Sequence, residues 1–270
     1  MRLFLVNVGV NSEDAARRGL RSPVFADGTF EFVPITERSD LNSVAGIATY
    51  ADLSSHTGQV RNIGELVPEA MRARRVHADP EFKTYTYGDT LSSRAANLKH
   101  VRRGDHVWFL ARLWEHDGRR WSGDSDFYLI GFLDVERNIL VPPGTAPEGL
   151  EQEVRHRISE NAHYKRLALA RDRSAFRVLV GSLQRSRRFE YAIRVVPEIA
   201  AHLFGGTFDP VERVFRRDGE TLCNKNGKPR RFETFGSITR SVQAFLDSEV
   251  AGDLEHIRTL VALAAQNGRG

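Results

Sequence analysis

Two apolar segments on either side of a polar turn constrain the fold of this chain more than any other feature. Residues 106–113 (HVWFLARL) and 127–135 (FYLIGFLDV) are rich in valine, leucine and aromatic residues, a composition that favours buried strands. The turn sequence Arg103-Gly104-Asp105 precedes the first segment, and His116-Asp117-Gly118 follows it. We therefore predict a β-hairpin, or two neighbouring strands, within one sheet.

Shorter patterns predict the remaining elements. Strands are expected at 3–10, at 30–35 (short or at a sheet edge, because Pro34 interrupts it) and at 176–181. Helices are expected at 91–101, 148–160, 197–204, 237–250 and 253–266, with a short one within 67–76. Residues 38–65 are polar and predict a long surface loop. The fold class is α+β: a curved mixed sheet with peripheral helices, in a single domain over 1–270 whose 237–270 part is helical.

Composition excludes several classes of protein. The 270 residues, 41% of them hydrophobic, suffice for a full core. Cys223 is the single cysteine, so neither an internal disulfide nor a multi-cysteine zinc site can form. No apolar segment approaches the roughly 18 residues that a membrane span requires. We expect a cytoplasmic protein without membrane contact.

Missing motifs exclude further classes. The chain has no GxxxxGK[ST] or GxGxxG phosphate-binding motif, no GxSxG elbow and no HExxH or zinc-deaminase signature. Its 9 histidines do not pair at ligand spacing, as His100 and His106 or His156 and His163 illustrate. We therefore predict no metal site and no cofactor.

Three polar segments are candidates for a binding or catalytic site. In Tyr85-Thr86-Tyr87-Gly88-Asp89, a tyrosine could stack on a base beside a carboxylate, or Asp89 could cap the following helix. The polar end of the first strand, from Asn7 to Ser12, could bind a ligand or simply end the strand. His163 could act as an acid or base, or be an ordinary hydrogen-bonded histidine.

Positive charge is clustered although the net charge is only +4. One group comprises Arg72, Arg74 and Arg75, a second Arg185, Arg187 and Arg188, and a third Lys225, Lys228, Arg230 and Arg231. Such clusters suit a surface that follows nucleic-acid phosphates. The alternative is that they are solvated surface residues without a ligand.

Five segments together resemble a known family. They are 7–11 (NVGVN), 21–35, 86–89 (TYGD), 98–109 and 128–132 (YLIGF). Their order and spacing resemble the nucleotide modification associated domain 3 family over most of residues 1–200, whereas 201–270 carries no matching motif. The glycine–aspartate turn before a buried strand is also similar to base-binding domains of the PUA, ASCH and EVE kind. That likeness implies an open β-barrel holding a nucleobase, often flipped, in an aromatic pocket.

The resemblance implies a role in modification of DNA bases, or in defence, in phages and bacteria. The expected ligand is a modified base in nucleic acid, DNA before RNA, or in a nucleotide. The expected pocket comprises Asn7, Asn11, Asp27, Tyr87, Asp89, Arg94 and His163. Tyr87 would stack on the base, Asp89 and His163 would be catalytic, and the second and third basic groups would contact phosphates.

The expected reaction is base excision or group transfer in a metal-free pocket. Two alternatives remain open at this point. One is a non-catalytic reader that binds a modified base and recruits a partner. The other is a small-nucleotide binder that does not contact DNA.

Overall fold

The computed structural model describes residues 3–10, 12–91 and 98–195, together with 207–209, 212, 214–217, 219–221, 223, 227, 229 and 243–244. Its centre is the hairpin of β6 (His106–His116) and β7 (Trp121–Val141), which pair antiparallel. This confirms the hairpin predicted from the two apolar segments. Both strands extend beyond their apolar segments. β7 does so because it continues past the hairpin and pairs with two further strands.

Additional strands flank the hairpin on both sides. β1 (Leu3–Val8) and β2 (Pro23–Phe25) run parallel to β6, whereas β8 (Phe176–Gly181) and β9 (Arg187–Arg194) run antiparallel to β7. β5 (Thr86–Thr90) pairs with β8, and β13 (Gln243–Ala244) pairs with β1. The sheet is therefore mixed, in the order β13-β1-β6-β7-β8-β5.

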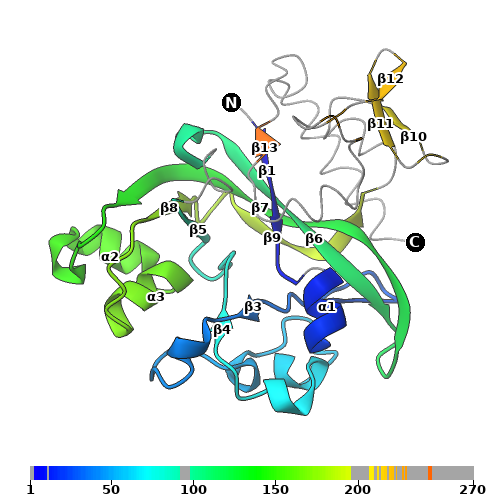
Figure 1. The fold of residues 1–270 in the computed structure, drawn as a ribbon, viewed down its shortest axis with the longest axis horizontal. Coiled ribbons are helices and arrows are strands. Elements are labelled where there is room, and N and C mark those ends of the chain that lie inside the picture. Colours follow the sequence, from blue (N-terminus) through cyan, green and yellow to red (C-terminus); the bar gives the residue numbers. More distant parts are fainter. Residues whose placement is uncertain are drawn as a thin grey trace.

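The sheet is curved and open (Figure 1). Among the described strands, β13 and β5 lie at opposite ends of the order and do not pair with each other. The α+β class and the mixed sheet are thus confirmed, while the open β-barrel of PUA-like domains stays a prediction. Gly131 lies where β7 shifts register against β9, and a β-carbon there would be 2.5 Å from the carbonyl oxygen of Arg187. The close approach requires glycine at this position.

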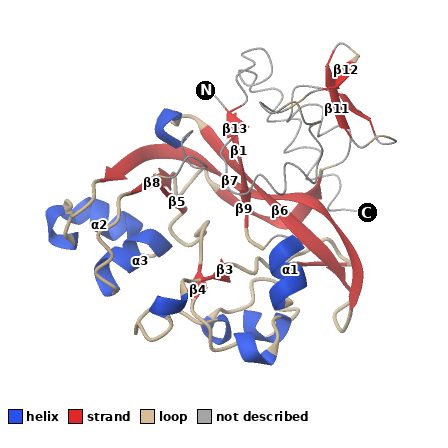
Figure 2. Cartoon of the chain, viewed as in Figure 1, coloured by secondary structure: helices blue, strands red, loops and turns tan. Residues whose placement is uncertain are grey.

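Within the described residues, helices are few and short, as Figure 2 shows. They are α1 (Ser12–Arg18), α2 (Gln152–Ile158) and α3 (Ala162–Leu169). Single 3-10 turns cover Ser39–Leu41, Tyr50–Asp52, Ile63–Leu66, Glu69–Met71 and Pro147–Gly149. The segment 38–65 is thus largely irregular, as predicted. No described helix is long and apolar enough to cross a membrane.

Two small sheets complete the described structure. β3 (Ile35–Thr36) pairs with β4 (Val76–His77), and β10 (Thr207–Asp209), β11 (Val214–Arg217) and β12 (Glu220–Thr221) form the other. β3 precedes the irregular segment 38–65 and β4 follows it, so the pairing of these strands brings the two ends of the intervening chain side by side.

Four predicted helices differ from the structure or lie largely outside the described residues. The helix expected at 237–250 is wrong at Gln243–Ala244, which form β13. Pairing with β1 satisfies backbone groups that an edge strand would otherwise expose. Most of the helix expected at 91–101, and those at 197–204 and 253–266, lie outside the described residues.

Three apolar clusters make up the core and fix the positions of the surrounding segments. The largest joins β1, β6 and β7 through residues such as Phe4, Phe109 and Ile130. A second packs the irregular segment against Trp114 and Leu20. A third holds α2 and α3 on β8 through Ile158, Leu167, Phe176 and Val178. These clusters bring α3 and the segment after β4 against the same edge strand, β5.

Candidate functional site

A small cavity lies where these three elements meet. Its volume is about 80 Å³. It is lined by Asn7, Val8, Gly9, Ile35, His77, Asp79, Tyr87, Gly88, Asp89, Thr90, His163 and Arg166. Polar and ionisable side chains from four separate parts of the chain thus converge on one space, which is the usual signature of a functional site.

Local hydrogen bonds place α3 against β5. The Asn161 side chain caps α3 by accepting from the backbone N–H of His163 at 3.0 Å. Its Nδ2 also donates to Oγ1 of Thr86 on β5, at 3.3 Å. Gly88 then allows close approach, because a β-carbon there would lie 2.7 Å from Cδ2 of His163. The imidazole of His163 is consequently held at the wall of the cavity.

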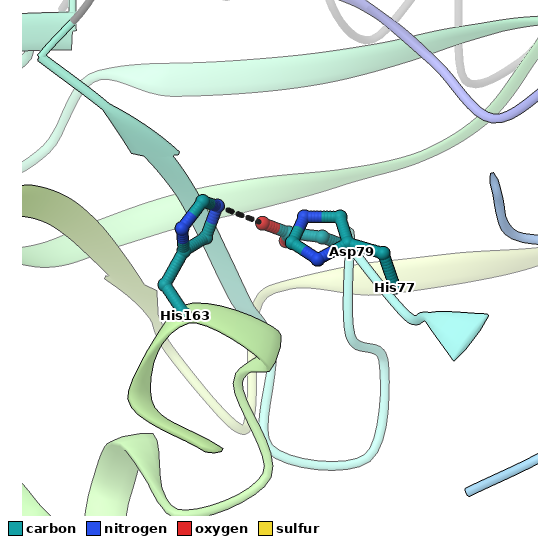
Figure 3. A group of neighbouring side chains, drawn as sticks. All are labelled: His77, Asp79 and His163. Atoms are coloured by element: carbon teal, nitrogen blue, oxygen red, sulfur yellow. Dashed lines mark ion pairs between the residues drawn. The ribbon is translucent and has the colours of Figure 1, made fainter. Parts of the chain in front are cut away.

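His77, Asp79 and His163 form a buried cluster within the cavity (Figure 3). One ligand-type atom from each residue lies within 4.8 Å of the others. Nε2 of His163 is 3.6 Å from Oδ2 of Asp79, and the two imidazole rings meet edge to face with centroids 4.8 Å apart. The two imidazoles and one carboxylate are all groups able to hold a metal ion.

Asp79 is the acid of this cluster and is deeply buried, with 3% of its side chain exposed. Its Oδ2 accepts from the backbone N–H of Gly88 at 2.8 Å. Its Oδ1 is buried without a hydrogen-bond partner in the described part of the chain. Burial raises the pKa of Asp79 well above its usual range, and the nearby charge of Asp89 acts in the same direction, against the Gly88 hydrogen bond.

Glu37 lies behind His77 and fixes its ring. Oε2 of Glu37 is 3.1 Å from Nδ1 of His77, and the carboxylate also accepts from Nε of Arg166 at 2.9 Å. Burial opposes ionisation of Glu37, but His77 and Arg166 outweigh it and lower its pKa to about 2. Glu37 is therefore an ionised, fully paired group at neutral pH.

A larger cleft adjoins the cavity. It has a volume of about 510 Å³ and shares Ile35 and Arg166 with the cavity lining. Its other lining residues are Asp14, Arg18, Thr36, Glu37, Arg38, Ser39, Met71 and Arg74. Four arginines against two acids make this cleft attractive to an anion.

A third pocket lies apart from these two and is mainly aromatic. It has a volume of about 600 Å³, and its lining includes Phe25, His116, Trp121 and Tyr128. The rings of His116 and Trp121 meet edge to face at 4.6 Å. Gly28, next to Asp27, is also in this lining.

The structure brings four of the expected pocket residues together. Asn7, Tyr87, Asp89 and His163 all line the cavity. Tyr87 is only 3% exposed and packs against Phe109, so its expected stacking on a base stays a prediction. Asp89 lies within β5 and is 9% exposed, and most of the helix that it was expected to cap, 91–101, lies outside the described residues.

Three other expected pocket residues are not placed in the cavity. Asp27 does not line it: its carboxylate accepts from the backbone N–H of Thr29 at 2.9 Å and from Gln59 at 3.1 Å. The Thr29 hydroxyl also donates to this carboxylate and contributes most to lowering the pKa of Asp27. These hydrogen bonds give Asp27 a turn-forming role. Asn11 and Arg94 lie outside the described residues.

The expected phosphate-contacting residues are dispersed. Arg185 pairs with Asp134 at 2.8 Å, and Arg187 donates to backbone carbonyls of its own turn. Arg188 is buried over the ring of Phe30, a placement that differs from the surface contact expected for it. Lys228, Arg230 and Arg231 lie outside the described residues.

Sequence reasoning missed His77, Asp79 and Glu37, and it did not place Arg166 in the expected pocket. One signal could have found the first two: His77 and Asp79 are two residues apart next to a strand, a spacing that puts side chains on one face. No local pattern indicates Glu37 or Arg166, whose partners are distant in sequence.

The family model described as nucleotide modification associated domain 3 matches residues 2–225. No curated protein matches the chain, and neither does any solved structure.

Proposed function

Because the chain belongs to the nucleotide modification associated domain 3 family, we propose that it is an enzyme acting on the base of a single nucleotide unit. The nucleotide lies in the arginine-lined cleft, and the edge of its base enters the polar cavity. The observation that carries this proposal is the junction of the two spaces, since Ile35 and Arg166 line both.

The sizes of the two spaces support this division. A volume of about 80 Å³ holds several water molecules, but it is far below the roughly 300–1,000 Å³ of whole small-molecule sites. The cleft, at about 510 Å³, falls within that range. The cavity therefore suits the reacting substituent or base edge, and the cleft suits the remainder of a nucleotide.

Charge in the cleft supports a bound phosphate. Arg74 is exposed and forms no ion pair with any described residue. Arg18 lies 4.0 Å from Asp14 and donates to the hydroxyl of Thr36, whereas Arg38 is already paired with Asp40 and Asp172. Arg18 and Arg74 are thus the guanidinium groups that we assign to a phosphate, with which arginine forms charge-assisted hydrogen bonds.

The convergence of buried polar groups favours an enzyme over a reader. Burying carboxylates and imidazoles costs stability, and such groups are what base excision or group transfer at a base uses. Asp89 and His163 are the residues proposed to contact the reacting atoms, and Asn7 the one to orient the base. The nucleotide is free or flipped out of DNA in a base-modification setting.

Calorimetric titration tests the proposal with two probes. These are a 5-substituted pyrimidine deoxynucleoside monophosphate and the same base within a single-stranded oligonucleotide. We expect saturable binding of one of them, weakened about tenfold or more by Arg74→Ala, since a lost charge-assisted hydrogen bond is worth about 1.5–3 kcal/mol. Arg119→Ala, in an exposed turn, is the matched control. The absence of saturable binding would overturn the proposal. So would Arg74→Ala and Arg18→Ala variants that each bind the probe as tightly as the original chain.

Mass spectrometry of the same mixtures then separates enzyme from reader. A mass change or an abasic site that is absent with His163→Gln supports catalysis. Tight binding with an unchanged probe removes the enzymatic part and leaves a binding protein.

The aromatic pocket favours a second candidate function, a non-catalytic reader of a modified base. Its lining by Trp121, His116 and Tyr128 could stack a base, at about 1–3 kcal/mol per stacked base. For this candidate, Trp121→Ala should abolish oligonucleotide binding while Arg74→Ala leaves it unchanged. The opposite pattern would exclude it.

A further inference from the structure

The buried cluster of His77, Asp79 and His163 carries an inference beyond nucleotide binding. His77 ends β4, Asp79 follows it by two residues, and His163 lies in the first turn of α3. All three are buried and their ligand-type atoms lie within 4.8 Å of one another (Figure 3). Three such groups meeting in one cavity require an explanation, because each costs free energy to bury.

The carboxylate of Asp79 points to a cation. Oδ1 is buried and has no hydrogen-bond partner among the described residues, although its companion Oδ2 accepts from Gly88. The 3.6 Å between Oδ2 and Nε2 of His163 is too long for a hydrogen bond. It is close to the separation of about 3.4 Å between two ligands that each lie about 2.1 Å from one tetrahedral ion.

The surroundings of His77 match the outer shell of a metal site. With its proton on Nδ1, His77 would donate to Oε2 of Glu37, 3.1 Å away, and Nε2 would then be the ring nitrogen able to bind a metal. Carboxylate–histidine–metal arrangements of this kind fix the tautomer and the ring orientation. Nη2 of Arg166 is also 3.0 Å from Nδ1, but its charge is taken up by the paired oxygens of Glu37.

We infer that His77, Asp79 and His163 bind one divalent transition-metal ion of the zinc or iron(II) class. Two imidazoles and one carboxylate favour such an ion over Mg²⁺ or Ca²⁺, which prefer oxygen ligands. Three protein ligands leave coordination positions open toward the cavity, as in catalytic rather than structural sites. The arrangement departs from the expectation of a metal-free pocket, which rested on histidine spacing along the sequence.

Titration of the full chain after dialysis against a chelator tests the site. Zn²⁺ and Co²⁺ are the probes, followed by calorimetry and by visible absorption of bound Co²⁺. We expect one ion per chain, and a rise in the thermal midpoint on binding. His163→Gln and Asp79→Asn should weaken binding more than about 100-fold, because loss of an outer-shell partner alone costs about 10–100-fold. The exposed His156→Ala is the matched control and should bind like the original chain.

A measurement on the unsubstituted chain tests the site even if the variants fail to fold. In ¹⁵N-histidine spectra, Zn²⁺ should shift the ring nitrogens of two of the 9 histidines. Absence of saturable binding, an unchanged affinity in His163→Gln, or shifts spread over many histidines would each overturn the site. These readouts need no nucleotide, so failure of the metal site and failure of the proposed function are distinguishable.

Discussion

Gly88 on β5 and His163 on α3 approach so closely that a β-carbon at residue 88 would lie 2.7 Å from Cδ2 of the imidazole. The same β-carbon would be 3.1 Å from Oδ1 of Asn161, the cap of α3. The glycine therefore acts as a spacer that sets how far His163 reaches into the cavity. A methyl group at this position pushes the start of α3 away from β5.

Gly88→Ala tests this relationship. We expect a loss of about 1–3 kcal/mol in the free energy of unfolding, the usual cost of overpacking, and a fall in Zn²⁺ affinity because His163 is displaced. Denaturant unfolding and calorimetry measure the two effects. Gly149→Ala is the control, since its nearest neighbour would be 3.9 Å away, and it should change stability by less than about 0.5 kcal/mol. Equal behaviour of the two variants would contradict the spacer role.

Glu37→Gln tests the group behind His77. The substitution removes the negative charge of the Glu37 carboxylate, which pairs with Arg166 and hydrogen-bonds with His77. We expect a loss of about 3–5 kcal/mol in the free energy of unfolding, because an unpaired buried charge remains. Zn²⁺ affinity should fall about 10–100-fold if the chain stays folded. Glu69→Gln, at an exposed position, serves as control, and a similar change there would show that the effect is not specific to this pair.

Asp89→Asn separates a catalytic from a structural role of this residue. The amide keeps an oxygen that can accept from the backbone N–H of Thr90, a hydrogen bond of 2.7 Å in the structure. Stability should therefore change by less than about 1 kcal/mol. Turnover of a modified nucleotide should fall at least about 100-fold if Asp89 transfers a proton. Unchanged turnover measured by mass spectrometry would remove Asp89 from the catalytic residues.

Acid should destabilise the protein through His106. Burial lowers the pKa of His106, an effect that Asp134 only partly offsets. The unfolded chain thus binds a proton at this histidine more readily than the folded chain does. The stability that the neutral ring contributes is therefore present above the usual pKa of about 6.5 and is lost as pH falls below it. The ring stacks on Phe132 with centroids 5.2 Å apart, so His106→Phe keeps the stacking without the titration.

Unfolding curves between pH 7.5 and pH 5, a range chosen around that value, measure the effect. The free energy of unfolding should fall less steeply in His106→Phe than in the original chain. Some slope should remain, because burial also lowers the pKa of His56 and of His116. Identical slopes in the two proteins would contradict the assignment.

Arg188→Ala should affect stability rather than nucleic-acid affinity. Its guanidinium lies 4.3 Å above the ring of Phe30, donates to the Phe30 carbonyl at 2.9 Å and approaches Glu31 to 3.9 Å. Burial lowers the pKa of Arg188 to about 10, which still leaves it charged at neutral pH. We expect about 1–3 kcal/mol of destabilisation, because the Phe30 carbonyl loses its donor. Glu31 loses its nearest cation but keeps the hydrogen bonds that its Oε1 accepts from Ser55 and Thr57.

Arg187→Ala, at an exposed neighbour on the same strand, is the comparison for Arg188→Ala. It should be near neutral in stability and reveal any phosphate contact through a weaker salt dependence of oligonucleotide binding. Similar stability losses in both variants would contradict the distinct burial of Arg188.

The sequence by itself determined the elements whose pattern is local. The apolar composition of β6 and β7 predicted the central hairpin, and Phe176–Gly181 was predicted as a strand with the bounds that it has. Strand periodicity and turn chemistry act over a few residues, so they can be recognised without the fold. For the same reason Tyr87, Asp89 and His163 could be chosen as polar residues in unusual local settings.

Only the tertiary structure decided which of these residues meet. His77 and Asp79 come from the end of β4, His163 and Arg166 from α3, and Glu37 from the residue after β3. Their convergence depends on how α3 packs on β8 and caps onto β5, and on the pairing of β3 with β4. Packing and strand pairing act between segments distant in sequence, so spacing along the chain could not reveal the His77, Asp79 and His163 cluster.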